Sequence, residues 1–458
     1  MNMLAGHKLF FIGIGGIGMS GLARYFSRKG ARVAGYDRTP SELTNQLQSE
    51  GIDVQFNESV ALIPEDFTTA KPGDVIVIRT PAVPVSSAIF TYWQQRGARI
   101  LKRAELLGMV TSDQLTIAVA GTHGKTTVST MLAHLLTVGK IKINAFLGGI
   151  STNYGTNVLL NGEAEVNVVE ADEYDRSFLK LHPKEAIITA MDPDHLDIYG
   201  TPEAMDAAYA EFASLVKGTL FVHKAIEGKF KEKKNVVTYS LDGTGIPRAE
   251  NLRIENGDHI FDLITEGAEM RDLKLGMSGR HNVENAIVAS ALAMKMGVSQ
   301  DLLREGLRSF RGVTRRFEKR INRNDVVFID DYAHHPRELD ALIGSVRELY
   351  PGKRITGVFQ PHLFSRTRDH AAEFAKSLSQ LDELILLEIY PAREDPIPGI
   401  SSTWLLDQVP MESKELCRKE DLVAELRSRD LQVLVTIGAG DIDREVPAIE
   451  RMLNERSS

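Results

Sequence analysis

The chain has 458 residues, about three times the ~150 residues of an average domain, so its length predicts several hydrophobic cores. Apolar residues make up 43% and charged residues 25%, which excludes a fibrous or wholly disordered protein. The 54 basic and 62 acidic residues give a net charge of −8, which argues against broad binding to nucleic acid or to anionic membranes.

A single cysteine, Cys417, can form neither an internal disulfide nor a cysteine-rich zinc site, and it fits a reducing compartment. Near the N-terminus, glycines interrupt the apolar run 9–12, so this run is neither a signal-peptide core nor the ~20 apolar residues of a membrane span. We therefore expect a cytoplasmic protein that does not insert into a membrane.

Short apolar runs rich in β-branched residues alternate with amphipathic stretches, which is the pattern of βα units. The pattern predicts an α/β protein in three blocks, with boundaries near residues 108 and 318. Residues 229–271 are polar and rich in turn glycines, so we expect loops and short strands there. The predicted strands are 9–12, 32–37 and 74–78 in the first block, 115–120, 166–170 and 186–190 in the second, and 326–330, 355–359, 384–389 and 431–437 in the third.

The first glycine-rich turn is Gly13-Ile-Gly15-Gly16-Ile-Gly18, between a predicted strand and a predicted helix. Asp37 stands about 20 residues further on, at the end of the next predicted strand, as in a dinucleotide-binding fingerprint. Because the N–H groups and the helix dipole at such a turn bind any pyrophosphate, the pattern fits NAD and a UDP-sugar equally well. The choice between the two depends on the rest of the chain.

The clearest chemical signal is the run Gly121-Thr122-His123-Gly124-Lys125-Thr126-Thr127, which lies between a predicted strand and the predicted helix 128–138. This is the context of a P-loop, in which backbone N–H groups cradle phosphates at a helix N-terminus. Lys125 can neutralise the β and γ oxygens, and the Thr126 hydroxyl can ligate magnesium. The general P-loop pattern has glycine where this chain has Val119, so a shorter loop, Gly-Thr-x-Gly-Lys-Thr-Thr, describes it better.

Two acidic clusters follow, each after a predicted strand: Glu170-Ala-Asp-Glu-Tyr-Asp175 and Asp192-Pro-Asp-His195-Leu-Asp197. Because the carboxyl ends of neighbouring parallel strands meet at one edge of a sheet, we expect Glu170 and His195 to face the same crevice as the P-loop. Carboxylate oxygens suit magnesium, whereas histidine is a less usual ligand of that ion. The alternative for His195 is a turn residue that caps backbone groups.

Three clusters in the last part of the chain share this polar character. They are Gly279-Arg-His281-Asn282-Val-Glu-Asn285, Arg315-Arg316-Phe317-Glu318 and Ile329-Asp-Asp331-Tyr-Ala-His334-His335-Pro336. Two asparagines three residues apart on one helical face can read an adenine edge, and an arginine and an aspartate can hold phosphate and ribose. Each cluster alone is weak support, but their order after a P-loop favours a nucleotide site.

Together these motifs resemble the Mur ligase family, the ATP-dependent ligases that build the peptidoglycan stem peptide, over essentially the whole chain. The resemblance implies an α/β protein with three domains: an N-terminal Rossmann-like domain for a UDP-sugar (1–107), a central P-loop ATPase-like domain (108–317), and a C-terminal Rossmann-like domain that binds the amino acid and closes the site (318–458). The segments that carry it are 11–21, 121–127, 170–173, 194–197, 281–285, 315–318, 330–336, 359–362 and 365–369.

The resemblance also implies roles for single residues. The residues expected to bind the UDP-sugar are Gly13, Gly15, Gly16, Gly18 and Asp37. Those expected to bind ATP are Gly121, Thr122, His123, Gly124, Lys125, Thr126, Thr127, Asn285, Arg316 and Asp331. The expected catalytic residues are Lys125, Glu170, His195, Arg316 and His334, and the expected ligands of Mg²⁺ are Thr126, Glu170 and His195. The residues expected to bind the amino acid are His334, His362 and Arg366, with Arg366 on its carboxylate.

Within the family, the pattern favours the branch that joins L-alanine to the lactyl carboxylate of UDP-N-acetylmuramate through an acyl phosphate. Peptide-extending members have a carbamylated lysine after the His-x-Asp motif, and no lysine occurs here between Asp197 and Lys217. The alternative within the family is a murein-peptide recycling ligase, which the segments 365–369, 388–391 and 396–399 disfavour. Outside the family, the alternatives are an NAD-dependent oxidoreductase and a catalytically silent nucleotide sensor, and the intact set of catalytic residues argues against both.

Two departures from the family pattern concern substrate contacts. Leu363 stands where many relatives have an arginine after the Pro-His pair, so a cationic contact in the amino-acid site is missing or replaced. Residues 79–82, Arg-Thr-Pro-Ala, stand where a Ser-Ser-Ala segment is common near the UDP-sugar. The sequence leaves the oligomeric state open.

Overall fold

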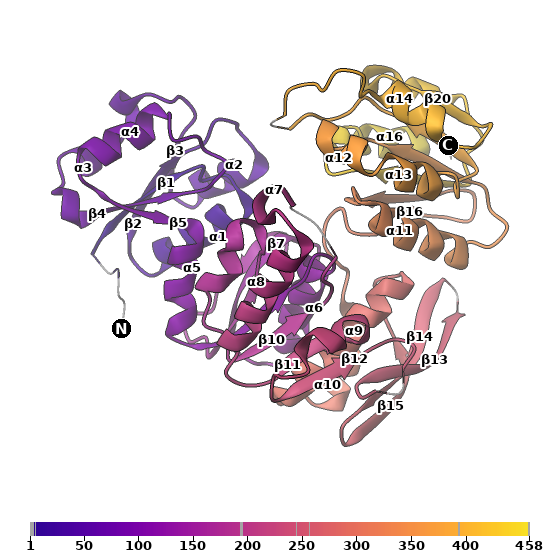
Figure 1. Cartoon of the computed structure of the whole chain (residues 1–458), viewed down its shortest axis with the longest axis horizontal. Helices are drawn as coiled ribbons and strands as arrows, with labels where there is room; N and C mark the ends of the chain where they lie inside the picture. Colours follow the sequence, from indigo (N-terminus) through magenta and orange to yellow (C-terminus); the bar gives the residue numbers. More distant parts are fainter. Residues whose placement is uncertain are drawn as a thin grey trace. The chain divides into compact units, whose positions relative to one another are not determined.

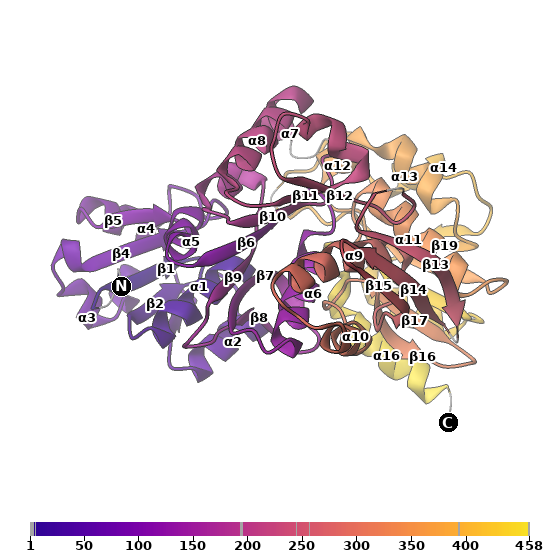
Figure 2. The ribbon, with the colours of Figure 1, turned by 90° about the horizontal axis from the view of Figure 1, so that it is seen from below.

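The computed structural model describes residue 4 and residues 6–192, 196–243, 245–255, 257–392 and 394–456 (Figures 1 and 2). The strands of the described residues form four sheets. The chain divides into two compact units. The first unit is Met1–Arg248, Ile264–Ala268 and Ile287–Gly306, and the second is Ala249–Leu263, Glu269–Ala286 and Leu307–Ser458. The three domain ranges inferred from the sequence stay a prediction.

The N-terminal sheet is parallel, with the strand order β3-β2-β1-β4-β5. Leu9 and Phe11 of the central strand β1 belong to one hydrophobic cluster, and Phe10 and Ile12 belong to another. Both faces are therefore covered, which is why this strand is a continuous apolar run. The strands are β1 (Lys8–Ile12), β2 (Arg32–Tyr36), β3 (Asp53–Gln55), β4 (Val75–Arg79) and β5 (Arg99–Lys102), and the helices are α1 (Ile17–Arg28), α2 (Glu42–Ser49), α3 (Glu65–Thr68), α4 (Ala88–Gln95) and α5 (Arg103–Ser112).

The central sheet has the order β12-β11-β10-β6-β9-β7-β8. Its paired strands are parallel except for the antiparallel hairpin β7–β8. The strands are β6 (Leu115–Ala120), β7 (Ile143–Ser151), β8 (Thr156–Leu159), β9 (Val166–Glu170), β10 (Glu185–Ile188), β11 (Leu220–His223) and β12 (Val236–Tyr239), and the helices are α6 (Lys125–Val138), α7 (Leu196–Tyr199) and α8 (Pro202–Leu215). The predicted strand–loop–helix context of residues 115–138 is confirmed.

The polar segment 229–271 contains the predicted turns and strands, but three of its strands are longer than predicted. They are β13 (Arg248–Glu255), β14 (Asp258–Thr265) and β15 (Ala268–Lys274), which form a small sheet of their own and are followed by α9 (Arg280–Lys295) and α10 (Gln300–Ser309). Phe261 and Leu263 of β14 are fully buried. Asp262 between them accepts hydrogen bonds from the Asn251 side chain and the Asp272 N–H at 2.7 and 2.8 Å. Because the polar Asp262 is fully hydrogen-bonded, it can lie within a buried strand, and composition alone underestimates that strand.

The C-terminal sheet has the order β16-β17-β21-β18-β19-β20, in which β16 is antiparallel to β17 and the other pairs are parallel. Its strands are β16 (Glu318–Asn322), β17 (Val327–Asp331), β18 (Ile355–Phe359), β19 (Glu383–Leu386), β20 (Lys414–Leu416) and β21 (Val433–Ile437). Its helices are α11 (Pro336–Leu349), α12 (Phe364–Asp369), α13 (Ala371–Leu378), α14 (Ser402–Gln408), α15 (Leu422–Arg427) and α16 (Val446–Glu455).

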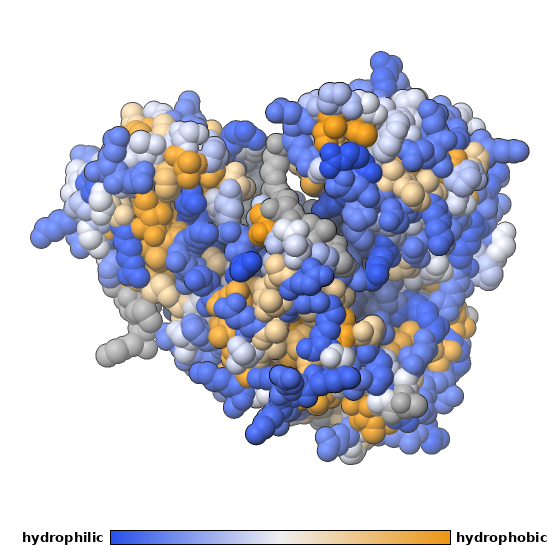
Figure 3. All heavy atoms as spheres, viewed as in Figure 1, coloured by the Kyte–Doolittle hydropathy of each residue, from blue (hydrophilic) through white to orange (hydrophobic). Residues whose placement is uncertain are grey.

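The surface is mainly hydrophilic on the face that Figure 3 shows, with apolar atoms in small groups. Large apolar side chains that are exposed, such as Leu62 and Val85, lie far apart in the sequence. Within the part of the chain that the structure describes, no helix is both long and apolar enough to cross a bilayer.

Gly35 of β2 offers a test of the packing in the N-terminal sheet. A Cβ atom at this position would lie 2.5 Å from the Phe11 carbonyl oxygen and 2.8 Å from Ile14 Cδ1. We expect Gly35→Ala to lower the free energy of unfolding by ~1–3 kcal/mol, because backbone must move to make room. Gly73→Ala is the control, since no atom lies within 4 Å there. Urea unfolding curves with equal midpoints for the two variants would contradict this packing.

Candidate functional site

The loop between β6 and α6 has the geometry of a phosphate-binding turn. Gly121 and Gly124 have φ values of 128° and 80°, a region that favours glycine. A Cβ atom on Gly121 would lie 2.1 Å from Thr189 Oγ1, so the loop also needs glycine for space. Because α6 begins at Lys125, directly after the loop, its first N–H groups and its dipole are available to an anion.

Thr122 and His123 connect this loop to the end of the neighbouring strand β10. The Thr122 N–H donates to the Ala190 carbonyl oxygen, and Thr122 Oγ1 accepts from the Asp192 N–H, both at 3.1 Å. His123 Nε2 lies 3.3 Å from Asp192 Oδ2. These two residues therefore hold the loop in place, and the buried Thr126 and Thr127 follow in the first turn of α6.

Lys125 forms a buried ion pair with Glu173, at 2.9 Å, and also donates to the Gly121 carbonyl oxygen at 2.6 Å. Burial alone would lower the pKa of Lys125, but Glu173, Asp172 and Glu170 outweigh burial and raise it, so the ammonium stays charged. Burial raises the pKa of Glu173, and Lys125 opposes that shift. Glu173 is 1% exposed, and sequence analysis missed its role although it lies in the quoted acidic cluster.

A cavity of about 230 Å³ joins the first glycine turn to the acidic cluster. Gly18 lines it from α1, and Glu170 and Asp172 line it from the end of β9. Glu170 Oε2 accepts a hydrogen bond from the N–H of Gly148, in β7, at 3.0 Å. The structure thus brings a residue predicted to bind the UDP-sugar, Gly18, into one cavity with a predicted magnesium ligand, Glu170.

The glycine turn itself is held by backbone and carboxylate acceptors. The Gly13 N–H donates to the Tyr36 carbonyl oxygen at 2.7 Å, and the Gly15 N–H donates to Asp37 Oδ2 at 2.8 Å. Gly16 is the N-cap of α1. Asp37 therefore lies against the turn, as the dinucleotide fingerprint predicts, and it occupies one of the turn's N–H groups.

Arg103 is a further cation of this cavity that sequence analysis missed. A Cβ atom on Gly18 would lie 2.7 Å from Arg103 Nη1, and Arg103 Nη2 lies 3.3 Å from Asp172 Oδ2. Arg103 follows β5 directly. Its place at the carboxyl end of a parallel strand is the signal that could have identified it.

The residues present fit a magnesium ion. Magnesium keeps several waters and binds through one or two carboxylates together with substrate phosphates. The Glu170 carboxylate, which lines the cavity, and the Thr126 hydroxyl at the start of α6 are donors of this kind. No cluster of three or more His, Cys, Asp or Glu side chains suited to a metal occurs within the described ranges. His195, the third predicted ligand, lies outside the described residues.

In the second unit, Asp331 is a structural anchor as well as a predicted nucleotide contact. Its two oxygens accept the N–H groups of Phe317 and Ala333 at 2.6 and 2.7 Å. Burial raises the pKa of Asp331 to about 6, and Arg316 opposes that shift.

The neighbouring arginines 315 and 316 differ in their contacts. Arg315 donates to the backbone carbonyl oxygens of residues 438 and 440 and is 14% exposed, whereas Arg316 is 30% exposed.

Arg316 lies over the ring of Tyr332, at 4.8 Å from its centroid, and 4.0 Å from Glu338 Oε1. Because the Arg315 guanidinium already donates to backbone carbonyl oxygens just after β21, Arg316 is the better placed of the two arginines to contact phosphate. The role predicted for Arg316 stays a prediction.

The structure brings His334, His362 and Arg366 together at the ends of β17 and β18. The two imidazole rings are 6.0 Å apart, and the Arg366 guanidinium donates to His362 Nδ1 at 3.4 Å. His334 Nδ1 lies 3.0 Å from the Tyr332 carbonyl oxygen. Since that oxygen only accepts, Nδ1 carries the proton and Nε2 is the acceptor of the neutral ring. Burial lowers the pKa of His334, Glu338 opposes this, and Arg366 adds to it.

Leu363 replaces the family's arginine in a conformation that is costly for leucine. Its φ is 71°, and its N–H donates to the Tyr390 carbonyl oxygen at 3.0 Å. Strained backbone of this kind clusters at functional sites. The Leu363 side chain supplies no cation at this turn, and Arg366 is the arginine that lies beside His362.

The two asparagines of α9 differ in exposure: Asn282 is buried, and Asn285 is partly exposed. Asn282 is 1% exposed, and its amide donates to the carbonyl oxygen of Ser278, just before the helix, at 2.7 Å. The Asn285 amide donates to Asn282 Oδ1 at 3.3 Å and is half-buried. Of the two asparagines considered for adenine, Asn285 is the one with an exposed edge.

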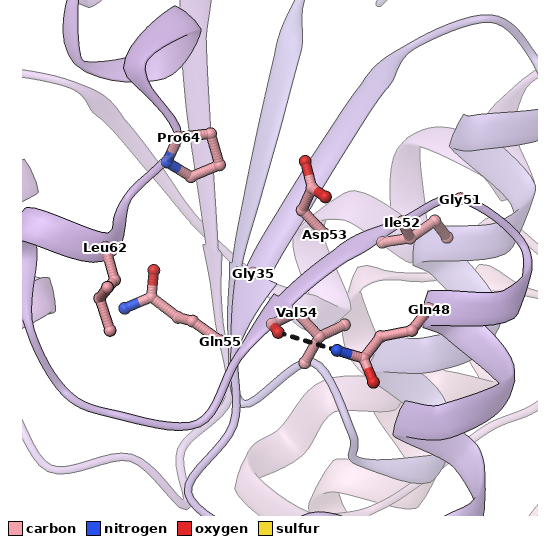
Figure 4. Close-up of a pocket in the computed structure, with 9 residues that line it drawn as sticks. All are labelled: Gly35, Gln48, Gly51, Ile52, Asp53, Val54, Gln55, Leu62 and Pro64. Atoms are coloured by element: carbon pink, nitrogen blue, oxygen red, sulfur yellow. Dashed lines mark hydrogen bonds between the residues drawn. The ribbon is translucent and has the colours of Figure 1, made fainter.

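A second cavity, of about 470 Å³, lies beside the edge strand β3 (Figure 4). The Gln48 side chain donates to the Val54 carbonyl oxygen there at 3.2 Å, and Leu62 is 54% exposed. The lining contains none of the residues predicted to bind a ligand. We therefore assign the candidate site to the cavity of Gly18 and Glu170 and to the P-loop.

Models of the Mur ligase family match the chain in three successive segments. The family's catalytic domain matches residues 8–114, the Mur ligase middle domain residues 119–293, and the glutamate ligase domain residues 315–440. The chain belongs to the Mur ligase family and has its three-domain α/β fold.

Relatives and solved structures agree with this assignment. The UDP-N-acetylmuramate–L-alanine ligase of Flavobacterium johnsoniae is 49% identical over 459 residues, which cover 99% of this chain and 100% of the relative. That of Parabacteroides distasonis is 48% identical over 97% of each chain. The crystal structure of UDP-N-acetylmuramate-alanine ligase from Thermotoga maritima has a TM-score of 0.83 at 27% identity, covering 98% of this chain and 99% of that one. A murein peptide ligase from Psychrobacter arcticus shares the fold, with a TM-score of 0.69 at 21% identity, covering 98% of this chain and 99% of that one.

The Lys125–Glu173 pair predicts a pH-dependent loss of stability. Lys125→Ala leaves Glu173 buried without its cation, which costs ~3–5 kcal/mol when the carboxylate must stay charged. Because the pKa of Glu173 then rises further above its ordinary value, the folded state holds a proton that the unfolded state releases. The variant should therefore be less destabilised at about pH 5 than at about pH 8.

Urea unfolding at both pH values measures this loss. The double variant Lys125→Ala/Glu173→Gln is the control, since it removes the buried charge and should recover most of the stability and lose the pH dependence. Equal stability of the single and the double variant at both pH values would show that the pair is not buried as described.

Proposed function

We propose that the protein uses ATP to join L-alanine to the lactyl carboxylate of UDP-N-acetylmuramate, a step in peptidoglycan biosynthesis. The observation that carries the proposal is the full-length agreement with alanine ligases, at up to 49% identity. The site geometry supports it, because a P-loop and a cavity lined by Gly18 and Glu170 lie in the same compact unit. The cytoplasmic location expected from the sequence stays a prediction.

In the proposed reaction, the lactyl carboxylate attacks the γ-phosphate of ATP and forms an acyl phosphate and ADP. The amine of L-alanine then attacks the acyl carbon, and phosphate leaves as the amide forms. Phosphoryl transfer of this kind depends mostly on positioning and on electrostatic stabilisation. Lys125, at the start of α6, would neutralise charge on the transferring phosphate, and Arg316 would add a second cation.

Magnesium would be held by Glu170 and Thr126, with His195 as the further predicted ligand. When bound, it would neutralise the phosphate oxygens. The Gly148 N–H keeps the Glu170 carboxylate oriented toward the cavity. Asn285 and Asp331 would contact the adenosine part of ATP, and the residues 121–124 would bind its phosphates through backbone N–H groups.

The histidine and arginine cluster of the second unit would bind L-alanine. Arg366 would hold the carboxylate, because a planar guanidinium can donate two parallel hydrogen bonds to it. The Nε2 atom of neutral His334 would accept the proton that the ammonium group must lose before it can attack. The lowered pKa of His334 keeps that nitrogen available near neutral pH.

A ligase that joins a peptide to the same sugar is the less supported alternative. The two relatives described above are alanine ligases aligned over 97% or more of the chain, whereas the murein peptide ligase of Psychrobacter arcticus, at 21% identity, shows a similar fold alone.

Phosphate release tests the proposed function. We expect ATP-dependent release with UDP-N-acetylmuramate and L-alanine together, and little with either substrate omitted or with a tripeptide in place of L-alanine. Lys125→Ala is the control and should abolish the release. Release with the tripeptide but not with L-alanine would support the recycling alternative, and binding of NAD without binding of the UDP-sugar would contradict the family function.

Arg366→Lys tests the amino-acid site. We expect kcat/KM for L-alanine to fall roughly 10- to 150-fold, or ~1.5–3 kcal/mol, mainly through KM, because an ammonium cannot make the two parallel bonds. The KM for ATP should change little. Arg368→Lys on the same helix is the matched control, since Arg368 is exposed and paired with Asp369 at 2.7 Å. An unchanged KM for L-alanine would move the carboxylate contact to another residue.

A further inference from the structure

The antiparallel hairpin β7–β8 contacts both ends of the cavity that contains Gly18 and Glu170. Gly148 of β7 and Asn157 of β8 both line the cavity that also contains Gly18 and Glu170. The hairpin contains none of the residues that the sequence motifs assign to substrate binding or catalysis. The hairpin makes side-chain hydrogen bonds to α1 at one end of the cavity and a backbone hydrogen bond to Glu170 at the other.

On one side, Asn157 binds the first turn of α1. Its amide donates to the Ile17 carbonyl oxygen and, at 3.0 Å, to Ser20 Oγ. Its carbonyl oxygen accepts from Arg24 Nη1 at 3.0 Å. All three contacts run to the helix whose N-terminus forms the glycine turn, and Asn157 itself is 1% exposed.

Arg24 connects α1 with residues in and just after helix α2. It is 3% exposed, and it also donates to Glu50 and Gln46, at 3.0 and 2.8 Å. A buried arginine in such a network has little freedom to move, because leaving any partner unpaired costs desolvation energy. The helix is further packed on the hairpin through the Tyr25 and Phe146 rings, whose centroids are 5.4 Å apart.

On the other side, the same hairpin contacts the Glu170 end of the cavity. The Gly148 N–H donates to the Glu170 carboxylate at 3.0 Å, so the hairpin touches both the helix of the glycine turn and the predicted magnesium ligand. A substrate with a diphosphate at one end and a carboxylate at the other must place both ends correctly at once. A misplacement of about 1 Å can cost ~100-fold in rate.

We propose that Asn157 is a positioning residue, which sets the distance between the diphosphate-binding turn and the Glu170 end of the cavity through the hairpin β7–β8. This inference rests on the proposed function, since it assigns the UDP-sugar to the glycine turn and its carboxylate to the side of Glu170. Asn157 acts through its hydrogen bonds to Ile17 and Ser20, and contributes no proton or charge to the reaction.

The test separates binding at either end from the reaction that needs both ends. For Asn157→Ala we expect kcat to fall ~10- to 100-fold and KM for UDP-N-acetylmuramate to rise, because the two ends are no longer aligned. The affinity for UDP alone and for a non-hydrolysable ATP analogue, each of which uses one end, should change less than about threefold. Asn157→Asp keeps the acceptor for Arg24 but loses both amide donors, so it should lose activity like the alanine variant.

Two further variants keep the test decisive. Asn161→Ala is the matched control, because Asn161 lies just after β8 and its side chain accepts from the exposed Glu163 N–H. It should behave as wild type. Ser20→Ala removes one of the two acceptors from the helix side and should give a smaller loss in the same parameters, even if the Asn157 variants fail to fold.

The outcomes distinguish the inference from the proposed function. Normal kcat and KM in the Asn157 and Ser20 variants of an active enzyme would overturn the positioning role and leave the function intact. Equal losses of UDP and ATP-analogue affinity would also overturn it, since they would indicate general damage to the fold. A wild-type protein that binds UDP and the ATP analogue but releases no phosphate would contradict the proposed function itself.

Discussion

A helix that begins within a few residues of the end of a parallel strand is the constraint on which the candidate site depends. Both β1–α1 and β6–α6 satisfy it, and turns this tight need glycines such as Gly13 and Gly124, at φ values of 86° and 80°. The first N–H groups of each helix have no partner inside the helix, so the turn offers them to an anion. The glycines that make these tight turns possible thus also expose the N–H groups at the two proposed phosphate-binding ends.

Buried charge then ties the chemistry to the stability of the fold. Lys125 is charged because Glu173 lies 2.9 Å away, and neither could be buried alone at low cost. Asp331 holds the turn that contains Arg316 by accepting two backbone N–H groups, so its removal would displace the arginine as well as the carboxylate. Residues of this kind serve both structure and function, and a loss of activity on their substitution needs a measurement of stability beside it.

The sequence predicted the parts of the site that depend on local patterns. The strands predicted at 115–120, 166–170 and 355–359 match β6, β9 and β18, because buried parallel strands are short continuous apolar runs. Composition underestimated the length of β14, in which the buried Asp262 is satisfied by the Asn251 side chain and the Asp272 N–H. Glu173 and Asn157 were missed for a different reason. Their importance comes from contacts between elements far apart in the chain, such as Asn157 with Ile17, and no spacing in the sequence reports such contacts.

The balance of charge in the site explains how an acidic chain can bind anionic substrates. Around the cavity and the P-loop, Arg103 is paired with Asp172 and Lys125 with Glu173, while Glu170 is held by a backbone N–H. The polyphosphate of ATP brings more negative charge toward Glu170, and this repulsion is strong where water is excluded. A divalent cation held by Glu170 and Thr126, as proposed above, would neutralise this charge. On this proposal the net charge of −8 is no obstacle, because local N–H groups, Lys125 and the cation would recognise the phosphates, and the charge of the whole protein would not.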